Sequence, residues 1–359
     1  MTTQTPAHRN IDTLDGVRGL ACLMVVLGHL AKEDFIFDIK GIGQLGVMLF
    51  FVLSGFLMAH LYLVTPLSPV RFGAYAFRRI FRVVPAYVVV AFVSYVLYQY
   101  YADFGYAVDK ETLIGLLTLS TQLSVFWTIP VEMKFYAFFP VLWLLLGYIR
   151  QPWLKGSILL VAIIVWLYTD IPTLLHLDLP RTRLTLTKHI EYFLGGMAAA
   201  YLSLGVERFC QARSPWRLSL VNAGFIFTLT LIVILVPQVF LHLFGIEHHM
   251  WDNSNIIAPV FIACITLAPN ISGMLGTIFT HRFARYLGAI SFSLYLVHYP
   301  CIKFVHDAAS TQSWPTVFRI MLALFMAGSV ASVMFYSIEQ PFRRFGARLA
   351  RALPAEPHG

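Results

Sequence analysis

The stretch Leu14-Asp-Gly-Val-Arg-Gly-Leu-Ala-Cys-Leu-Met-Val-Val-Leu-Gly-His-Leu30 carries two ionisable side chains, Arg18 and His29, inside an apolar run. An ionisable group at membrane depth is costly and persists mostly where it has a task or a partner. The two residues are eleven positions apart, which at about 100° per residue puts both side chains on one helix face. They are roughly 16 Å apart along the axis, about half of the hydrocarbon core. The stretch predicts a membrane helix with a fixed positive charge toward one side and an imidazole toward the other.

The composition indicates an integral membrane protein built of helices. The 359 residues are 58% hydrophobic and only 12% charged, with a mean hydropathy of +0.72. Soluble domains contain about 25% charged residues, and the apolar runs are too long for buried core helices or barrel strands. We expect one all-α membrane domain over residues 1–359, with cytoplasmic tails at 1–13 and 345–359.

Apolar windows predict a bundle of about ten transmembrane helices. They cover residues 14–31, 43–64, 83–101, 130–148, 157–171, 189–204, 218–236, 255–270, 286–305 and 316–338. The run from Leu113 to Phe126 is apolar but short, which indicates a re-entrant or interfacial segment. The first run lacks a small-residue cleavage site, so we expect no removable signal peptide.

The basic residues between these helices give the orientation. With a cytoplasmic N-terminus, sixteen of the 26 basic residues fall in inner loops, six in outer loops and four within helices. The inner set is Arg9, Arg71, Arg78, Arg79, Arg82, Arg150, Lys155, Arg208, Arg213, Arg217, Arg282, Arg285, Arg343, Arg344, Arg348 and Arg351, and the outer set is Lys32, Lys40, Lys110, Arg181, Arg183 and Lys188. Cytoplasmic loops are enriched in Lys and Arg, so both termini are expected in the cytoplasm. This placement also explains the net charge of +8 without nucleic acid binding.

The same orientation sorts the polar residues into two layers. The inner layer holds Arg18, Arg78, Arg79, Arg82 and Glu339, and the outer layer holds His29, Trp127, Glu132 and His298. The histidines and the carboxylate are therefore expected on the side opposite the arginines.

His29 is the candidate catalytic base, because a neutral imidazole near a carboxylate can take a proton from a hydroxyl at neutral pH. Glu132, at the same expected depth, is the candidate to orient that imidazole. The alternatives are a buried histidine bonded to a backbone carbonyl, and an interfacial glutamate beside Lys134.

Three arginines, Arg78, Arg79 and Arg82, form a cluster before a membrane helix. Guanidinium groups bind phosphate oxygens with two parallel hydrogen bonds. The cluster therefore fits a phosphate-bearing ligand, and it equally fits a topology determinant that touches anionic lipid.

Two further motifs place hydroxyl groups inside apolar helices. Ser54 and Gly55 lie in an aromatic segment, where small residues favour close helix packing. Ser291, Tyr295 and His298 are spaced to share one helix face. The spacing allows two interpretations: these side chains line a polar cavity, or they hydrogen-bond with one another between helices.

Several patterns predict no site. Gly41-Ile-Gly43-Gln-Leu-Gly46 matches a dinucleotide-binding motif by letter but opens a membrane helix. His242, His248 and His249, with Glu247 and Asp252, fit a solvated outer loop better than a metal site. Cys22, Cys210, Cys264 and Cys301 are scattered and are expected to be small core residues, with neither disulfides nor metal.

Six stretches in order resemble the acyltransferase family 3 membrane proteins, which O-acylate sugars of cell-surface polysaccharides, lipopolysaccharides and some secreted metabolites. They are Leu14–Ala21 with His29, Gly46–Phe56, Arg78–Arg82, Phe126–Tyr136, Ser291–His298 and Glu339–Arg344. The resemblance covers nearly the whole chain. Ile129-Pro130 departs from the family's usual Ser-Leu, although proline is tolerated in a first helical turn. Many members also carry a C-terminal hydrolase-like domain, which does not occur before Gly359, so its role is expected to be absent or supplied by a partner.

The resemblance implies roles for individual residues. It implies His29 as the catalytic residue with Arg18 and Glu132, and the arginine cluster with Glu339 as the site for an acyl-CoA donor, by default acetyl-CoA. Ser54, Trp127, Ser291, Tyr295 and His298 are the expected substrate-lining residues. We expect an acyl-CoA-dependent O-acyltransferase in a bacterial inner membrane, acting on a glycan or glycolipid acceptor.

A transporter or flippase is the competing interpretation. Intramembrane Arg18, His29, Glu132 and His298 also suit a proton relay or a substrate pathway. Against it, one half of the chain does not repeat in the other, and the six stretches match no transporter family.

Overall fold

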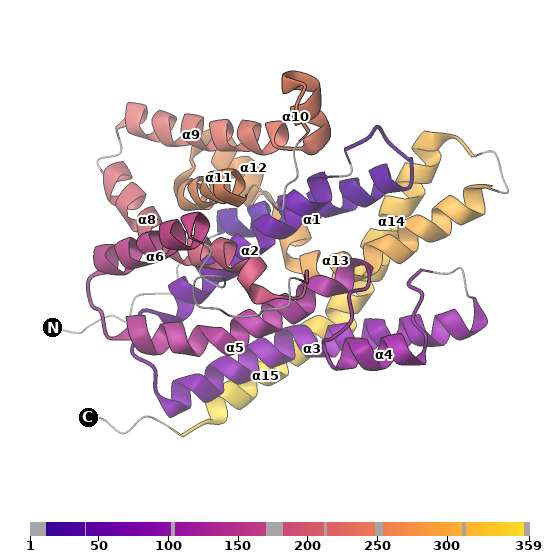
Figure 1. The fold of residues 1–359 in the computed structure, drawn as a ribbon, viewed down its shortest axis with the longest axis horizontal. Helices are drawn as coiled ribbons and strands as arrows, with labels where there is room; N and C mark the ends of the chain where they lie inside the picture. Colours follow the sequence, from indigo (N-terminus) through magenta and orange to yellow (C-terminus); the bar gives the residue numbers. More distant parts are fainter. Residues whose placement is uncertain are drawn as a thin grey trace.

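A computed structural model describes residues 12–39, 41–101, 105–169, 182–211, 214–247, 254–310 and 314–354. Within these ranges the chain is helical and contains no strand, so the expected all-α fold is confirmed. Figure 1 shows the helices packed as one bundle.

The long helices follow the apolar runs of the sequence. They are α1 (Asp12–Lys32), α2 (Ile42–Tyr62), α3 (Pro69–Tyr100), α5 (Thr128–Gly147), α6 (Pro152–Tyr168), α8 (Ile190–Cys210), α9 (Pro215–Ile234), α11 (Ser254–Leu267), α13 (Arg282–Ser310) and α14 (Thr316–Met334). The shorter ones are α4 (Lys110–Leu117), α10 (Pro237–Phe244), α12 (Gly273–Thr280) and α15 (Gln340–Ala352). Single turns are η1 (Ser124–Trp127), η2 (Leu186–Lys188), η4 (Ala268–Asn270) and the π turn η5 (Phe335–Glu339).

Each of the ten expected membrane segments coincides with a helix, but fewer helices meet the requirements of a span. Among the described residues, seven helices are long and apolar enough to cross a membrane. The count is eight if the segment from α11 to η4 and the helix α12, which meet at a bend of 98°, together form one broken span. Helix α6 is apolar but has only 17 residues. The fold is that of a multi-pass membrane protein, and the count of ten is not confirmed.

Local sequence explains where several helices begin. Proline occupies the first turn of α3, α6 and α9, where its missing N–H group is not needed. Pro130 lies in the first turn of α5, as expected. The short apolar run before it forms α4 and η1 rather than a span, and the side chain of Asp109 caps α4 by accepting from the backbone N–H of Thr112.

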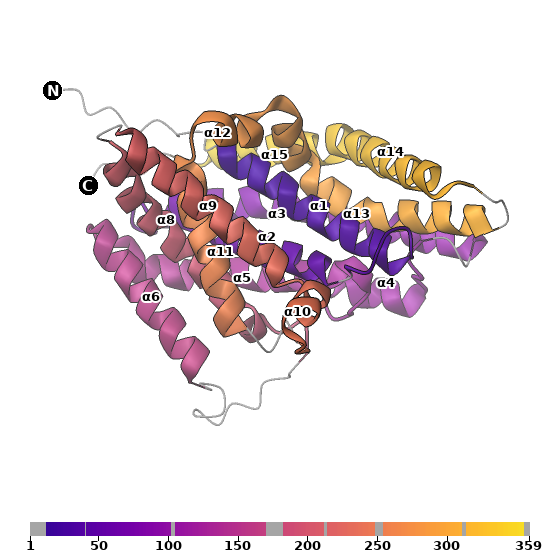
Figure 2. The same cartoon turned by 90° about the horizontal axis from the view of Figure 1, so that it is seen from above.

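The bundle is held by close packing around α1 and α2. Helix α1 packs on α13 and α2, and α2 packs on α8; Figure 2 shows α1 beside α13 from above. A Cβ added to Gly55 of α2 would lie 1.9 Å from the Phe193 carbonyl oxygen, and one added to Gly196 of α8 would lie 1.8 Å from that of Val52. These two positions accept only glycine, which confirms the packing interpretation of Gly55.

One end of the bundle, here called the arginine end, gathers the start of α1 and α13 and the end of α2 and α5. Arg285 pairs with Asp12 at 3.2 Å, and the indole N–H of Trp143 donates to the Thr65 carbonyl oxygen at 2.7 Å. Contacts within this end therefore join the starts of α1 and α13, and the ends of α2 and α5.

The opposite end, here called the histidine end, joins the end of α1 to α13 and α14. Tyr299 donates to the Glu33 carboxylate at 3.3 Å, and the Arg319 guanidinium lies 4.6 Å from the centre of the Phe35 ring. The four cysteines are free; Cys22, Cys264 and Cys301 are buried, as expected of small core residues, whereas Cys210 is only partly buried.

Candidate active site

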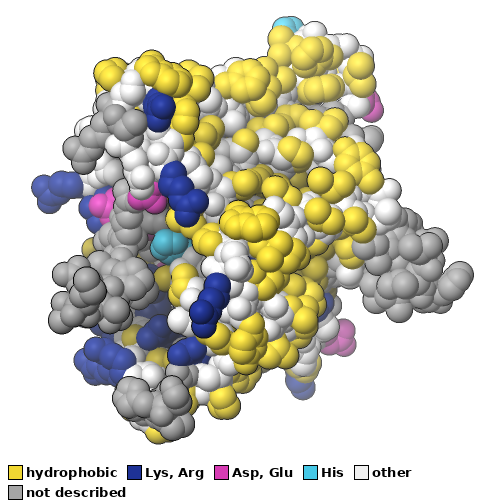
Figure 3. Space-filling view, turned by 90° about the vertical axis from the view of Figure 1, so that its left-hand side faces the viewer, with side chains coloured by type: hydrophobic (Ala, Val, Ile, Leu, Met, Phe, Trp, Pro, Cys, Tyr) yellow, Lys and Arg dark blue, Asp and Glu magenta, His cyan; other side chains and the backbone are white. Residues whose placement is uncertain are grey.

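An arginine-lined cavity of about 490 Å³ opens at the arginine end. Its lining is Leu61, Tyr62, Thr65, Arg71, Ala74, Arg78, Arg79, Arg82, Trp143 and Arg343. The lining includes five arginines and no acidic residue, and its volume is that of a ligand site. Figure 3 looks onto this end of the molecule, where Lys and Arg side chains gather on one half of the face. Such a cavity favours an anionic ligand.

Arg79 is the buried member of this set, with 6% of its surface exposed. It donates to the hydroxyl of Tyr62 at 3.2 Å and lies over the Tyr62 and Tyr136 rings, 5.3 and 5.7 Å from their centres. Its Nε has no hydrogen-bond partner within the described part of the chain. Aromatic rings thus hold this guanidinium in place without neutralising it.

A second recess of about 440 Å³ lies beside the arginine cavity. Its lining is Asp15, Arg18, Ala289, Phe335, Gln340, Arg343, Arg344 and Ala347. Arg343 lines both spaces and pairs with Glu339 at 3.4 Å. Glu339 itself is 3% exposed and accepts from Ser293 at 2.7 Å. The structure therefore places Glu339 behind the arginine cavity, where it holds Arg343.

A smaller chamber lies between α1, α2, α3, α5 and α13. It holds about 70 Å³ and is lined by Arg18, Val47, Phe50, Phe51, Leu53, Ser54, Leu57, Arg82, Val83, Thr128, Ile129, Glu132, Ser291, Phe292 and Tyr295. Arg82 also lines the arginine cavity, and Arg18 also lines the second recess. The chamber is too small for a whole cofactor and is a neighbour of the arginine cavity, since Arg82 lines both.

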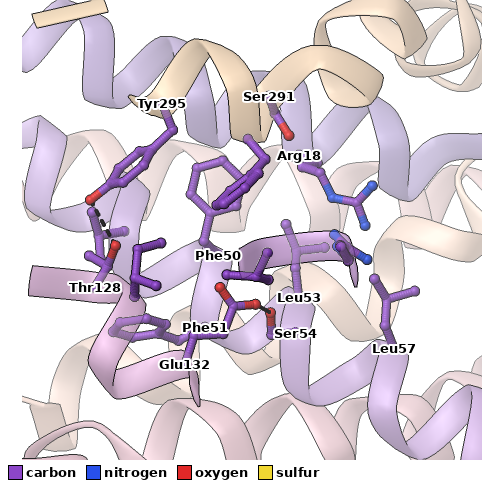
Figure 4. A pocket seen from close by; sticks show the side chains of 15 residues that line it. Arg18, Phe50, Phe51, Leu53, Ser54, Leu57, Thr128, Glu132, Ser291 and Tyr295 are labelled. Atoms are coloured by element: carbon purple, nitrogen blue, oxygen red, sulfur yellow. Dashed lines mark hydrogen bonds between the residues drawn. The ribbon is translucent and has the colours of Figure 1, made fainter. Parts of the chain in front are cut away.

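Glu132 is fixed in the chamber wall by two donors on one oxygen. Ser54 donates to its Oε1 at 3.1 Å (Figure 4), and the Tyr136 hydroxyl makes a short hydrogen bond to the same atom. The other oxygen, Oε2, has no hydrogen-bond partner among the described residues. A carboxylate held in this way presents an acceptor to whatever occupies the chamber.

Tyr295 and Thr128 form the far side of the chamber, with Phe50 between them and Arg18 (Figure 4). Thr128 donates to the Tyr295 hydroxyl at 3.1 Å, and Tyr295 donates to the Val125 carbonyl oxygen at 2.8 Å. Ser291, one turn earlier on α13, also lines the chamber. Two of the three residues expected to share a face therefore reach this space.

The third residue, His298, is fully buried and contacts His29 instead. The Nε2 of His298 lies 3.2 Å from Nδ1 of His29, and the ring of Tyr295 lies 6.0 Å from that of His298. The His29 imidazole thus contacts His298 and, at 3.0 Å, the Val25 carbonyl oxygen, as in the alternative of a histidine bonded to a backbone carbonyl. The Glu132 carboxylate is used by Ser54 and Tyr136. The expected pairing of His29 with Glu132 is not formed.

The remaining expected residues lie nearby. Trp127 packs on Phe51, 6.2 Å between ring centres, behind the chamber wall. Lys134 donates to the Leu184 carbonyl oxygen at 2.8 Å rather than to Glu132. His248, His249 and Asp252 lie outside the described residues. Within those ranges no group of three His, Cys, Asp or Glu is placed to hold a metal ion.

Sequence reasoning missed several residues of the site. Tyr136 lies four positions after Glu132, a helical spacing that predicts contact. Arg71 and Arg343 belong to the set of inner basic residues, but only the fold brings them to the arginine cavity. Tyr62 has no sequence signal that would connect it to Arg79.

A sequence model of the acyltransferase domain family matches residues 11–334. The chain therefore belongs to this family of acyltransferases, as its motifs predicted. It is similar to "Putative peptidoglycan O-acetyltransferase YrhL" of Bacillus subtilis, with 25% identity over 97% of the chain and 57% of the relative. It is also similar to "Peptidoglycan O-acetyltransferase OatA" of Listeria monocytogenes, with 24% identity over 95% of the chain and 57% of the relative. The chain thus spans less than two thirds of these relatives, and no solved structure matches it.

Proposed function

We propose that the protein is an O-acyltransferase that moves an acetyl group from acetyl-CoA, bound at the arginine end, to a sugar hydroxyl at the histidine end. The observation that carries this proposal is that the arginine cavity and the chamber are neighbours, because Arg82 lines both. Membership of an acyltransferase family favours chemistry over transport.

The donor side is supported by charge and size. Coenzyme A carries several phosphate charges on its nucleotide half, and five arginines without an acidic residue line a space of about 490 Å³. Guanidinium groups bind phosphate strongly in such surroundings. The nucleotide half is therefore assigned to the arginine cavity.

The chamber suits the thin thioester arm of the donor. Its volume of about 70 Å³ and its largely apolar lining fit a flexible chain with a few amide groups. Glu132 Oε2 is available to accept from an amide N–H of that arm, while Ser54 and Tyr136 hold the other oxygen. This gives Glu132 a role in binding the donor.

His29 supplies the base for the transfer step. Its Nε2 has no hydrogen-bond partner within the described part of the chain and can accept the proton of the acceptor hydroxyl. The hydroxyl oxygen then bonds to the acyl carbon, the carbon–sulfur bond breaks, and coenzyme A leaves as a thiol after taking up a proton. Because Tyr295 and His298 separate the chamber from His29, transfer requires movement of this ring layer.

The acceptor and the orientation follow from the relatives and the loops. The inner set of basic residues favours a cytoplasmic arginine end in a bacterial inner membrane, where acyl-CoA is made. Peptidoglycan sugars are the first acceptor class to test, since two relatives are named for acting on them.

The deciding experiment uses the full chain purified in detergent, radiolabelled acetyl-CoA and N-acetylglucosamine oligosaccharides. We expect release of the free thiol together with labelled sugar, and loss of both in His29→Ala. The matched control is His306→Ala on α13, whose partially exposed imidazole pairs with Asp307. Full acetyl transfer by His29→Ala at normal protein levels contradicts the proposal, as does movement of the label across vesicles, without any chemistry, when the same protein is reconstituted in lipid.

A further inference from the structure

The pair formed by His29 and His298 has an arrangement that simple burial does not require. His298, in α13, has 0% of its surface exposed, while His29 is half-buried in α1. They are 269 positions apart in the chain. Their rings meet edge to face, with centres 4.8 Å apart and planes at 74°.

The hydrogen bonds fix where the ring protons lie. Nδ1 of His298 faces the Leu294 carbonyl oxygen at 3.0 Å, and Nδ1 of His29 faces that of Val25 at 3.0 Å. A carbonyl oxygen only accepts, so both Nδ1 atoms carry the proton. The His29 N–H is then shared between Val25 and the Nε2 lone pair of His298, 3.2 Å away, a three-centre bond of a common kind.

The neutral state of His298 is required by its surroundings. A second proton on its Nε2 would point at the N–H of His29, so that two donors would face each other. It would also place a charge in a fully buried site, which is costly without a partner of opposite charge. The charged groups near His29 are Lys32, at the end of α1, and Glu33, the residue that follows the helix, and Glu33 accepts from Tyr299.

We propose that His298 is a positioning residue, which holds His29 with Nδ1 protonated and leaves Nε2 as the nitrogen that takes the acceptor proton. This inference rests on the proposed role of His29 as the base. When His29 becomes an imidazolium, its Nδ1–H already has two acceptors, Val25 and His298, so its charge is stabilised without rearrangement. The ring of Tyr299, next to His298, also packs edge-on against the His29 ring, with 5.2 Å between ring centres, and limits its rotation.

The test compares three variants of the full chain in the assay with acetyl-CoA and N-acetylglucosamine oligosaccharides. His298→Phe keeps a ring but removes the acceptor, whereas His298→Gln returns an amide oxygen near the place of Nε2. The control is His306→Gln on the same helix. We expect His298→Phe to lower kcat by about tenfold or more, but by less than the full factor of about 10²–10⁴ that general-base catalysis contributes. We expect an unchanged KM for acetyl-CoA, and partial recovery of kcat in His298→Gln.

Each other outcome overturns the inference. Wild-type kcat in His298→Phe, with His29→Ala inactive, overturns this inference alone. Equal losses in His298→Phe and His298→Gln, with a raised KM and a lowered melting temperature, mean that His298 only stabilises the fold. Activity in His29→Ala overturns the proposed base, and this inference with it.

Discussion

Ser54 and Glu132 are joined by a 3.1 Å hydrogen bond that connects α2 to α5 across the wall of the chamber. Together with Tyr136, this bond occupies one carboxylate oxygen and leaves the other facing the cavity. The side chain is thus held in one orientation before any ligand enters. Preorganised acceptors of this kind bind a donor group without a cost of rearrangement.

Glu132→Gln is expected to weaken binding of the thioester arm. The amide oxygen can still accept from Ser54 and Tyr136, but an amide NH₂ group, which only donates, replaces the acceptor Oε2 that faces the chamber. Loss of a hydrogen bond to a charged group costs about 1.5–3 kcal/mol, so KM should rise about 10- to 100-fold. The rise should be equal for acetyl-CoA and for acetyl-pantetheine, because both have the arm. The control is Glu111→Gln on the exposed face of α4, and unchanged KM values in Glu132→Gln would remove Glu132 from the donor site.

Arg78→Gln is expected to raise KM for acetyl-CoA without changing KM for acetyl-pantetheine. Arg78 lines the arginine cavity but not the chamber, so its guanidinium should contact the phosphates and not the arm. We expect KM for acetyl-CoA to rise about tenfold, as for one charge-assisted hydrogen bond of about 1.4 kcal/mol, and KM for acetyl-pantetheine to stay constant. Arg348→Gln, on the exposed face of α15, should change neither value. An equal effect of Arg78→Gln on both donors would show that the arginines do not bind phosphate.

The sequence predicted the helices and the arginines better than the pairing of the polar residues. Long apolar runs form membrane helices because every backbone group must be paired inside the segment, so α1, α2 and α13 were found with small errors at their ends. The arginines of α3 were found as a cluster because they are close in sequence. A topology argument gives only the depth of a residue, and depth alone put Glu132 beside His29.

The actual neighbours are set by rotation of the helices about their axes. Glu132 turns toward α2 and meets Ser54, and His298, on α13, meets His29. These angles depend on packing between helices far apart in the chain, such as the contact of Gly55 with Phe193. The bend of 98° between η4 and α12 likewise has no signal in the apolar pattern.

Glu339→Ala is expected to affect both stability and the donor site. The substitution leaves the Ser293 hydroxyl, which is fully buried, without its acceptor and removes the ion pair that holds Arg343. A buried polar group left unpaired costs about 1–3 kcal/mol, so the melting temperature of the purified protein should fall. KM for acetyl-CoA should also rise, because Arg343 lines the arginine cavity.

Ser293→Ala separates these two effects. It removes the hydrogen bond to Glu339 but keeps the pair with Arg343, so it should leave KM for acetyl-CoA unchanged. A rise of KM in Ser293→Ala as large as in Glu339→Ala would mean that Glu339 acts through the fold and not through Arg343.

Gly196→Ala is expected to disrupt the contact between α2 and α8. The added Cβ would lie 1.8 Å from the Val52 carbonyl oxygen, and 2.7 Å from the backbone N of Phe56, so the two helices must separate. Overpacking costs about 1–3 kcal/mol when only side chains shift, and here backbone atoms must move, so we expect a clear loss of melting temperature. Because α2 carries Ser54 and Phe50 into the chamber, acetyl transfer should fall as well.

Gly205→Ala, on the same helix, is the matched control. An added Cβ there meets nothing within 4 Å, and alanine favours a helix over glycine by about 0.5–1 kcal/mol. The variant should therefore melt at the wild-type temperature or slightly above it, with full activity. If Gly196→Ala and Gly205→Ala melt alike, the close approach of α2 and α8 is not what holds the chamber wall in place.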